Sequence, residues 1–458
     1  MNRCASQQPV ISHSLFAIRF SLFAFFTLLA AFPAPARATK LDLSSNVDVK
    51  AVNYTNLQTG GEKKGAAFYS ENATLGFVIK DIKLEKTTDS SMDVGIVLNS
   101  VGTGSSSSSD TLNSAQFQEA VSRYPNTTGA PFVKEAYVRI YKFLTPRVTA
   151  TLGRQAFMLG QGIALADDGI GLPGARLEIA KIFKVIKGEF FFFQPYQGDI
   201  FTKITGGGIY YPSNEGLWHF YHFWEQTSLP QGVAPMDGPG YTFISRTRKL
   251  TGIRYFLNHS QLNFDGEAVV QKGLTRQPDN RGRVDYLGYA FLIKGSWSQD
   301  VKFFGTSKMR MAFGKSSGNS GPVSDKDKAF LPTFGHKFKG VERDGFGEIA
   351  GATLYSIIQT SGTVNGLPNG VSGLNIINVG LDMPYKKIML SVDLVKIRAS
   401  QNANDGATQV AREWDFKATY PMGDSLKLKA VYALFKPLSL YDENTTIKLV
   451  SIGITAKF

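Results

Sequence analysis

The sequence predicts an all-β protein, a transmembrane antiparallel β-barrel of about 16 to 18 strands with short periplasmic turns and long extracellular loops. Three observations predict this fold. Apolar and polar residues alternate with period 2 over most of the chain, short and long connections alternate between the strands, and an export signal comes first. Helical periodicity is scarce, and no later window approaches about 18 consecutive apolar residues, so no transmembrane helix is expected.

The first 38 residues are expected to be a signal peptide. Arg3 and Arg19 precede an apolar run over 20–31 that is too short to span a bilayer. Ala36-Arg37-Ala38 then places small residues at the cleavage positions. Removing 1–38 takes away three Arg and no acid, so the formal net charge falls from +13 to +10. Residues 39–458 are then one barrel domain in the bacterial outer membrane.

The composition supports a chain that buries a large apolar area. Its 458 residues are 43% hydrophobic and include 46 Gly, 34 Phe and 18 Tyr, which excludes a disordered chain. The single cysteine, Cys4, lies in the signal peptide. The mature chain therefore has no disulfide, no cysteine-ligated metal site and no cysteine nucleophile.

The strands are placed by alternation. In 262–270, Leu262 and Phe264 share one face, and Asp265 and Glu267 share the other. The last segment, 445–458, alternates in the same way. This rule predicts strands near 41–55, 66–79, 92–102, 133–143, 147–157, 174–183, 188–197, 202–213, 217–228, 248–258, 260–271, 284–298, 308–318, 371–384, 387–398, 413–421, 425–436 and 445–458. A further hairpin within 344–360 is an open alternative.

The connections distinguish a membrane barrel from a soluble sandwich. A sandwich has no reason to sort its loops by length, whereas an outer-membrane barrel has turns at one end and loops at the other. Short links are expected near 144–146, 184–187, 214–216, 258–260, 384–387 and 422–424. Long links are expected near 103–132, 158–173, 229–247, 272–283, 319–370 and 399–412, and the two kinds alternate almost strictly.

Aromatic residues fit the same fold. The segments 190–193 and 217–224 are rich enough in aromatic residues to form interfacial girdle strands. Phe458 ends an alternating apolar strand, which is typical of the signal read by the barrel assembly machinery. The loops 103–132 and 319–370 are long enough to fold into the mouth as a gate.

Catalytic motifs are missing. The sequence has no Gly-x-Ser-x-Gly, Walker or His-Glu-x-x-His motif, and no nucleophile–base pair can be named. His219 and His222 point to opposite faces of a strand and cannot chelate one metal, so girdle positions are favoured for both. We therefore expect no enzyme activity, metal or cofactor. Nucleic acid is not expected as a partner, since the chain is exported and its cations are dispersed.

Alternation places charged side chains of both signs toward the lumen. Cations in a low-dielectric lumen favour anions, and acids among them prevent tight trapping. Tyr137 and Tyr141 share this phase and either stack on sugar rings or pack in the wall. The lumenal candidates are Glu135, Arg139, Arg176, Glu178, Arg254, Asp265, Glu267, Asp393, Glu413, Asp415, Lys417, Lys427 and Lys429. Alternatively, the excess charge lies in loops that bind lipopolysaccharide phosphates, through Lys63, Lys64, Lys326, Lys328, Lys337 and Lys339.

Several short segments, taken in order, resemble the alginate-export family of bacterial outer-membrane channels. They are Leu152-Gly-Arg-Gln155, Asp167-Asp168, Gly174-Ala-Arg-Leu-Glu178, Asn263-Phe-Asp-Gly-Glu267, Gln271-Lys-Gly273, Ser317-Gly318, Phe330-Leu-Pro-Thr-Phe-Gly-His336, Gly340, Glu413-Trp-Asp-Phe-Lys-Ala-Thr-Tyr420 and Tyr432-Ala-Leu-Phe-Lys-Pro437. The resemblance extends from about residue 70 to the end. It departs at Asn319, where the family has Asp, and in the Lys residues that supply much of the lumenal charge.

The resemblance implies an 18-stranded barrel that passes a polyuronate or another anionic oligosaccharide through a basic constriction. It also implies that Arg139, Arg154, Arg176 and Arg254 line the pore. Arg154 shares the outward phase of Leu152, so a bulge at Gly153 is needed to bring it inside. The expected function is a passive channel for anionic solutes. Two alternatives stay open: a general or small-anion porin, and a barrel enzyme or adhesin. Expected partners are membrane lipid, lipopolysaccharide and the barrel assembly machinery.

The processing site gives a direct test. We expect the mature protein, purified from outer membranes, to begin at Thr39, because cleavage follows Ala36-Arg37-Ala38. N-terminal sequencing or intact mass measures this. A full-length chain that starts at Met1 would contradict the assignment.

Overall fold

The computed structural model divides into two compact units, Met1–Lys40 and Leu41–Phe458. The expected signal peptide, 1–38, lies outside the described residues. Among the described residues, no helix is both long and apolar enough to cross a membrane. The structure describes residues 39–59, 62–84, 89–104, 117, 121, 123–167, 169–197, 200–229, 244–276, 282–335, 337–359, 365–404, 406–441 and 445–458.

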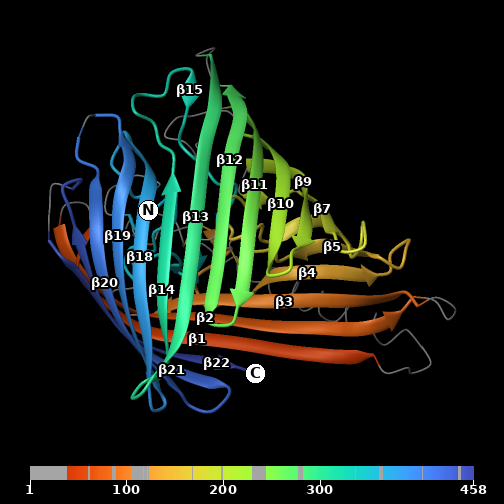
Figure 1. Ribbon diagram of the computed structural model, residues 1–458, viewed down its shortest axis with the longest axis horizontal. Coiled ribbons are helices and arrows are strands. Elements are labelled where there is room, and N and C mark those ends of the chain that lie inside the picture. The colour runs from red at the N-terminus through yellow and green to blue at the C-terminus, as the bar shows by residue number, and fades with distance from the viewer. Residues whose placement is uncertain are drawn as a thin grey trace, which may run out of the picture. The chain divides into compact units, whose positions relative to one another are not determined.

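The second unit is a closed antiparallel barrel of 18 long strands, which confirms the predicted fold class (Figure 1). Each predicted strand overlaps one of them. They are β1 (Lys40–Thr59), β2 (Glu62–Lys83), β3 (Ser91–Gly104), β4 (Phe132–Tyr141), β5 (Val148–Gln155), β6 (Leu172–Ile179), β7 (Lys187–Phe193), β9 (Ile200–Pro212), β10 (Gly216–Ser228), β11 (Ser245–His259), β12 (Leu262–Arg276), β13 (Arg283–Val301), β14 (Gly305–Ser316), β18 (Val371–Tyr385), β19 (Ile388–Asn402), β20 (Gln409–Pro421), β21 (Leu426–Pro437) and β22 (Ile447–Lys457).

The ring closes where β1 pairs with β22, from Asn46 opposite Lys457 to Thr55 opposite Lys448. Four two-residue strands lie outside this series. β8 (Tyr196–Gln197) extends the β7–β9 pair, and β15 (Lys326–Asp327) runs parallel to β13. β16 (Phe338–Lys339) and β17 (Glu342–Arg343) form a separate hairpin. The open alternative of a barrel hairpin within 344–360 is therefore wrong.

The predicted sorting of connections is confirmed in part. One end carries the short turns, such as 142–147 and 386–387, and the other carries the 54-residue stretch from 317 to 370. Four connections at the loop end are short, those after β1, β7, β12 and β19, so the long links predicted near 272–283 and 399–412 are wrong in length. Sorting of this kind follows from the insertion of a barrel through one face of a membrane.

The outward faces of the strands carry exposed apolar side chains, as a lipid-facing surface requires. On β22, Val450, Ile452 and Ile454 are 48%, 56% and 49% exposed, whereas Ser451 between them is buried. The predicted alternation is thus correct in phase. The same alternation divides the expected aromatic girdle, because Phe190 and Phe192 face outward while their neighbours on β7 are buried inside.

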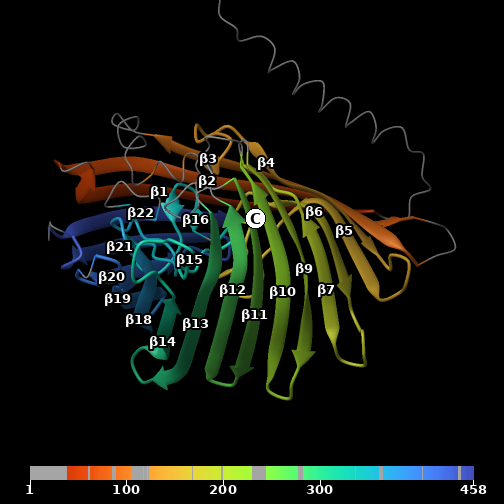
Figure 2. The same cartoon turned by 90° about the horizontal axis from the view of Figure 1, so that it is seen from above.

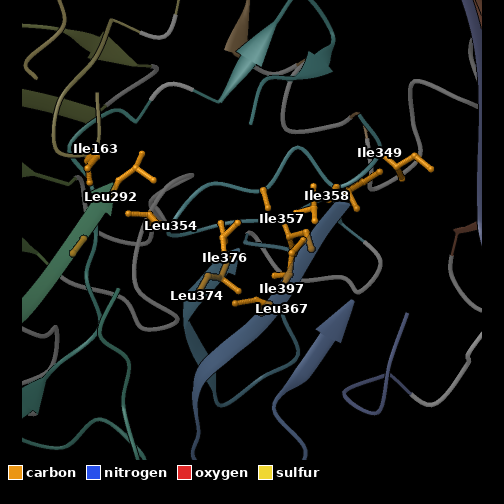
Figure 3. Packing of buried hydrophobic residues seen from close by; sticks show 14 of the residues in the cluster. Ile163, Leu292, Ile349, Leu354, Ile357, Ile358, Leu367, Leu374, Ile376 and Ile397 are labelled. Carbon is orange, nitrogen blue, oxygen red and sulfur yellow. The ribbon is translucent and has the colours of Figure 1, made fainter. Parts of the chain in front are cut away.

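Two connections, 156–171 and 317–370, contribute most of the described residues that fill the interior of the barrel, and Phe117 and Tyr124 of the connection after β3 join them. We call 156–171 and 317–370 the inward segments. Their apolar residues form one buried cluster with the inward faces of the strands. Figure 3 shows Ile349, Leu354, Ile357 and Ile358 packed beside Ile376 and Ile397 of the wall. Figure 2 shows β15 and β16 among the strands. Near the loops the inward faces of the strands are therefore apolar and covered by the inward segments.

The two faces of β22 provide a matched test. Ile452→Arg places a charge in lipid near the middle of the strand and should lower the free energy of unfolding by about 2–4 kcal/mol. Thr455→Arg puts the same side chain on the inward phase, where the Thr455 hydroxyl contacts Asp48 at 3.3 Å, and should cost less. Guanidinium unfolding in lipid vesicles measures both. Equal losses would contradict the assigned faces.

Candidate functional site

Most of the partly exposed charges inside the barrel lie in the half of the strands next to the short turns. They come from two stretches of the wall, β6 with β11–β12 and β14 with β18–β21, and only β13 lies between β12 and β14. They form ion pairs rather than rings of one sign. This arrangement is the candidate functional site.

The first group is centred on Arg176 of β6. Its guanidinium lies 2.8 Å from Glu189 and 3.0 Å from Glu178. Glu189 also accepts a 2.7 Å hydrogen bond from the Tyr210 hydroxyl, and the Tyr210 ring stacks on His219 at 4.0 Å between centroids. Arg176 is thereby held against its own wall with two carboxylates.

The second group joins β11 and β12 to the first inward segment. Arg254 donates two 2.7 Å hydrogen bonds to Asp265 and one of 2.7 Å to the carbonyl of Gly160. Glu267 accepts hydrogen bonds from the Gln161 backbone N–H and from the Tyr221 hydroxyl. Gly160 has a φ of +58°, and a Cβ there would collide with the Glu267 carboxylate, so glycine permits this close approach.

The third group is a fully buried ion pair that holds the second inward segment. Glu225 and Arg248 are each 0% exposed, and Arg246 adds a 2.8 Å contact to Glu225. Arg248 also donates to the carbonyl of Leu331 and, at 3.0 Å, to the Thr333 hydroxyl. Because a buried charge without a partner is costly, this group fixes the segment to the wall.

The fourth group links five strands, β14 and β18–β21. Arg310 pairs with Asp382 at 2.8 Å and with Asp393 at 3.0 Å. Lys417 lies 2.8 Å from Asp393 and 3.4 Å from Glu348 of the second inward segment. Lys429 lies 2.9 Å from the same Glu348 oxygen. A carboxylate from a loop is thus shared by lysines of two adjacent strands.

The turn 346–352 places Glu348 there through its backbone. Glu413 accepts hydrogen bonds from the N–H groups of Ile349 at 2.6 Å and Ala350 at 2.9 Å. Asp415 accepts one of 3.2 Å from the N–H of Glu348. Gly347 has a φ of +86°, and a Cβ on it would collide with the Glu413 carboxylate. Two wall carboxylates therefore hold three consecutive N–H groups.

Glu348 stays ionised at neutral pH. Burial raises the pKa of its carboxyl, but the adjacent Lys429 and Lys417 ammonium groups outweigh burial and hold the pKa below the ordinary Glu value.

Several predicted site residues are where the sequence places them. The lumen-facing, partly exposed ones fall into the groups above or lie beside the short turns. They are Arg139, Arg176, Glu178, Arg254, Asp265, Lys417, Lys427 and Lys429. Their role in conduction stays a prediction.

Three predicted pore residues require correction. Glu267 and Asp415 face inward, but they are 3% and 2% exposed because the inward segments cover them. Their carboxylates accept hydrogen bonds from backbone N–H groups of the inward segments and do not line an open path. Arg154 stays on the outward phase, since β4 and β5 pair without a register shift and no bulge forms at Gly153. Its guanidinium donates to the carbonyls of Ile170 and Gly171.

Several inward-phase cations have no carboxylate within ion-pair distance among the residues that the structure describes, among them Arg139, Lys294, Lys308 and Lys427. Arg139 donates to the Thr151 hydroxyl at 3.3 Å, and Lys294 lies 5.9 Å from the Phe346 ring centroid. Lys427 is exposed at the short-turn end of β21. Lys294, Arg310 and Glu348 were missed by the sequence reasoning, although the phase of β13 and β14 marks the first two as inward.

Two of the lysines considered for lipopolysaccharide lie inside the barrel. Lys337 is 1% exposed and its ammonium lies over the Tyr355 ring at 5.1 Å. Lys339 pairs with the inward Asp48 at 2.9 Å. The described residues contain no cluster of three or more His, Cys, Asp or Glu able to hold a metal. His219 lies inside the barrel and His222 faces outward, so the girdle assignment is wrong for His219.

No protein-family model and no curated protein sequence matches the chain. Solved structures do match. A BenF-like porin from Pseudomonas fluorescens Pf-5 has 10% identity and a TM-score of 0.53, over 92% of this chain and 98% of that chain. Pseudomonas aeruginosa OccK9 (OpdG) has 9% identity and a TM-score of 0.54, over 92% and 98%. P. aeruginosa OpdK with vanillate has 9% identity and a TM-score of 0.50, over 91% and 98%.

At this identity the likeness establishes the fold. The chain has the closed β-barrel fold of these proteins, one of which is described as a porin. The comparisons give no support to the finer resemblance to the alginate-export family.

The buried ion pair gives a stability prediction. Arg248→Met leaves Glu225 inside with one cation fewer and frees the carbonyl of Leu331, so unfolding should cost about 3–5 kcal/mol less. Arg283→Met is the matched control, because its pair with Asp285 is 64% and 41% exposed and should contribute about 0–1 kcal/mol. Guanidinium unfolding in vesicles compares them. Equal small losses would show that the buried group does not hold the segment.

Proposed function

We propose that the protein is a passive outer-membrane channel for small anionic solutes, with carboxylates as the favoured class. The observation that carries this proposal is the set of inward cations without a carboxylate partner among the described residues, which includes Arg139, Lys294, Lys308 and Lys427. These side chains present positive charge to the lumen that no ion pair with a described carboxylate neutralises. Low-dielectric walls strengthen the attraction of such cations for anions.

The filled interior favours small solutes over polymers. The inward segments bury apolar residues such as Leu354 and Ile357 in the barrel. A solute must pass beside these segments, which suits small molecules better than a polyuronate chain. The crystallised relative with vanillate, a small aromatic carboxylate, supports the same substrate class. This reasoning favours the small-anion porin over the oligosaccharide channel.

Acidic oligosaccharides are the second candidate. Tyr137 and Tyr141 lie on the lumenal phase, with the Arg139 guanidinium 5.4 Å from the Tyr137 ring centroid. An aromatic ring beside a cation fits an acidic sugar as well as an aromatic carboxylate.

Membrane components complete the proposed partners. The exposed apolar faces meet lipid, and Lys326 and Lys328 in the loop after β14 are available to lipopolysaccharide phosphates. Phe458 is 75% exposed, and its backbone pairs with Ser45 through two 3.0 Å hydrogen bonds. We propose that this free ring is read by the assembly machinery before the barrel closes.

Reversal potential across a planar bilayer under a KCl gradient tests the function. We expect the purified protein to prefer chloride, and the triple variant R139Q/K294M/K427M to weaken that preference, because it removes three of the inward cations that lack carboxylate partners. Cation preference in the wild-type protein would contradict the proposal. The double variant K203M/K396M is the control, since these lysines lie on outward phases.

The same bilayer distinguishes the two solute classes. Benzoate is expected to reduce the chloride current at a lower concentration of carboxylate groups than an oligouronate does. Block by the oligouronate alone would favour the second candidate. Absence of conductance under all these conditions would contradict a channel.

A further inference from the structure

The two lysines of the fourth group are arranged as a binding site for a carboxylate, and the Glu348 carboxylate occupies it. Lys417 and Lys429 project inward from adjacent strands, and their ammonium groups lie 3.4 and 2.9 Å from one oxygen of Glu348. Two ammonium groups on one carboxylate oxygen are the contacts that a free carboxylate seeks. Here the carboxylate comes from a loop rather than from the wall.

The Glu348 side chain is not what fixes the turn 346–352. The turn is held by the N–H groups accepted by Glu413 and Asp415. It is also closed on itself, because Phe346 and Ala352 exchange two 2.9 Å backbone hydrogen bonds and the Gly351 N–H donates to the Gly347 carbonyl at 2.9 Å. The backbone therefore presents the Glu348 carboxylate to the lysines, and removing its charge leaves these anchors in place.

The contact is accessible to solutes. The side chains of Glu348, Lys417 and Lys429 are 24%, 20% and 35% exposed, unlike the 0% of the Glu225–Arg248 pair. A solute carboxylate that replaces Glu348 makes the same contacts with the two ammonium groups, so the exchange of one carboxylate for the other has a small cost. Lys417 keeps Asp393 at 2.8 Å when Glu348 is displaced, whereas Lys429 has no second carboxylate within ion-pair distance among the described residues.

We propose that Lys417 and Lys429 form a carboxylate-binding site in the lumen and that Glu348 is its tethered occupant, which a solute carboxylate displaces during passage. The inference rests on the proposed anion channel and names the place where its solute binds. A tethered competitor at high effective concentration keeps binding weak, and weak binding permits release.

Equilibrium binding of benzoate to the detergent-solubilised full-length protein tests the site. Glu348→Gln is expected to bind benzoate about tenfold more tightly than the wild type by calorimetry, because the competitor is removed. The double variant E348Q/K429M is expected to lose this gain. Glu348→Asp keeps the charge but shortens its reach, so it should give an intermediate affinity and serves as the test if Glu348→Gln fails to fold.

Glu178→Gln is the matched control. It also removes a lumenal carboxylate beside a cation, but Arg176 keeps Glu189 at 2.8 Å, so its benzoate affinity should stay within about twofold of wild type. An unchanged affinity in Glu348→Gln, an equal gain in Glu178→Gln, or a gain that survives K429M would each overturn the inference.

The binding measurement is independent of conductance. If bilayer recordings find no anion preference, the proposed function fails, and the benzoate affinities still decide the site. If the channel prefers anions but the affinities do not change, the site fails and the channel function stands.

Discussion

Buried ionisable groups on the inner wall need polar partners, and this requirement determines how the interior is arranged. Glu225, Glu267, Glu413 and Arg248 are almost completely buried, and each is compensated in part by backbone or side-chain groups of an inward segment. Without those partners the desolvated groups would cost several kcal/mol each. The same contacts fix where the segments lie, so the wall charges act as positional restraints for the loops.

Two kinds of interaction share the task of filling the barrel. The apolar cluster near the loops stabilises the packing without fixing its orientation. The free energy gained by burying Leu354 or Ile376 depends on the apolar area removed from water and not on the angle of contact. Hydrogen bonds from N–H groups to Glu267 and Glu413 supply direction, and Gly160 and Gly347 allow the backbone to approach those carboxylates. The contacts of Gly160 with Glu267 and of Gly347 with Glu413 follow the same design on two different strands, β12 and β20. Glu348 and its lysines lie at the border of the apolar layer.

The strands could be predicted because alternation encodes a face directly, and the phases of Lys417, Lys429 and Asp265 were correct. Alternation does not tell what covers a face. Glu267 and Asp415 were therefore taken for pore residues although turns cover them. Glu348 belongs to a loop without periodicity, so nothing in the sequence marks it. The aromatic run 217–224 was assigned to one girdle, but period 2 sends every second ring inside.

The pairing of β1 with β22 has a kinetic consequence. Asp48 and Thr455, which touch across this seam, are 407 residues apart in the chain. Bringing such distant segments together costs roughly 5 kcal/mol of chain entropy by the logarithmic law for loop closure. Until the last strand arrives, the edge of β1 presents unpaired N–H and C=O groups, the template on which chains aggregate. The protein must therefore be protected along this edge for the whole time of its export, and the seam is the last part of the ring to gain its stability.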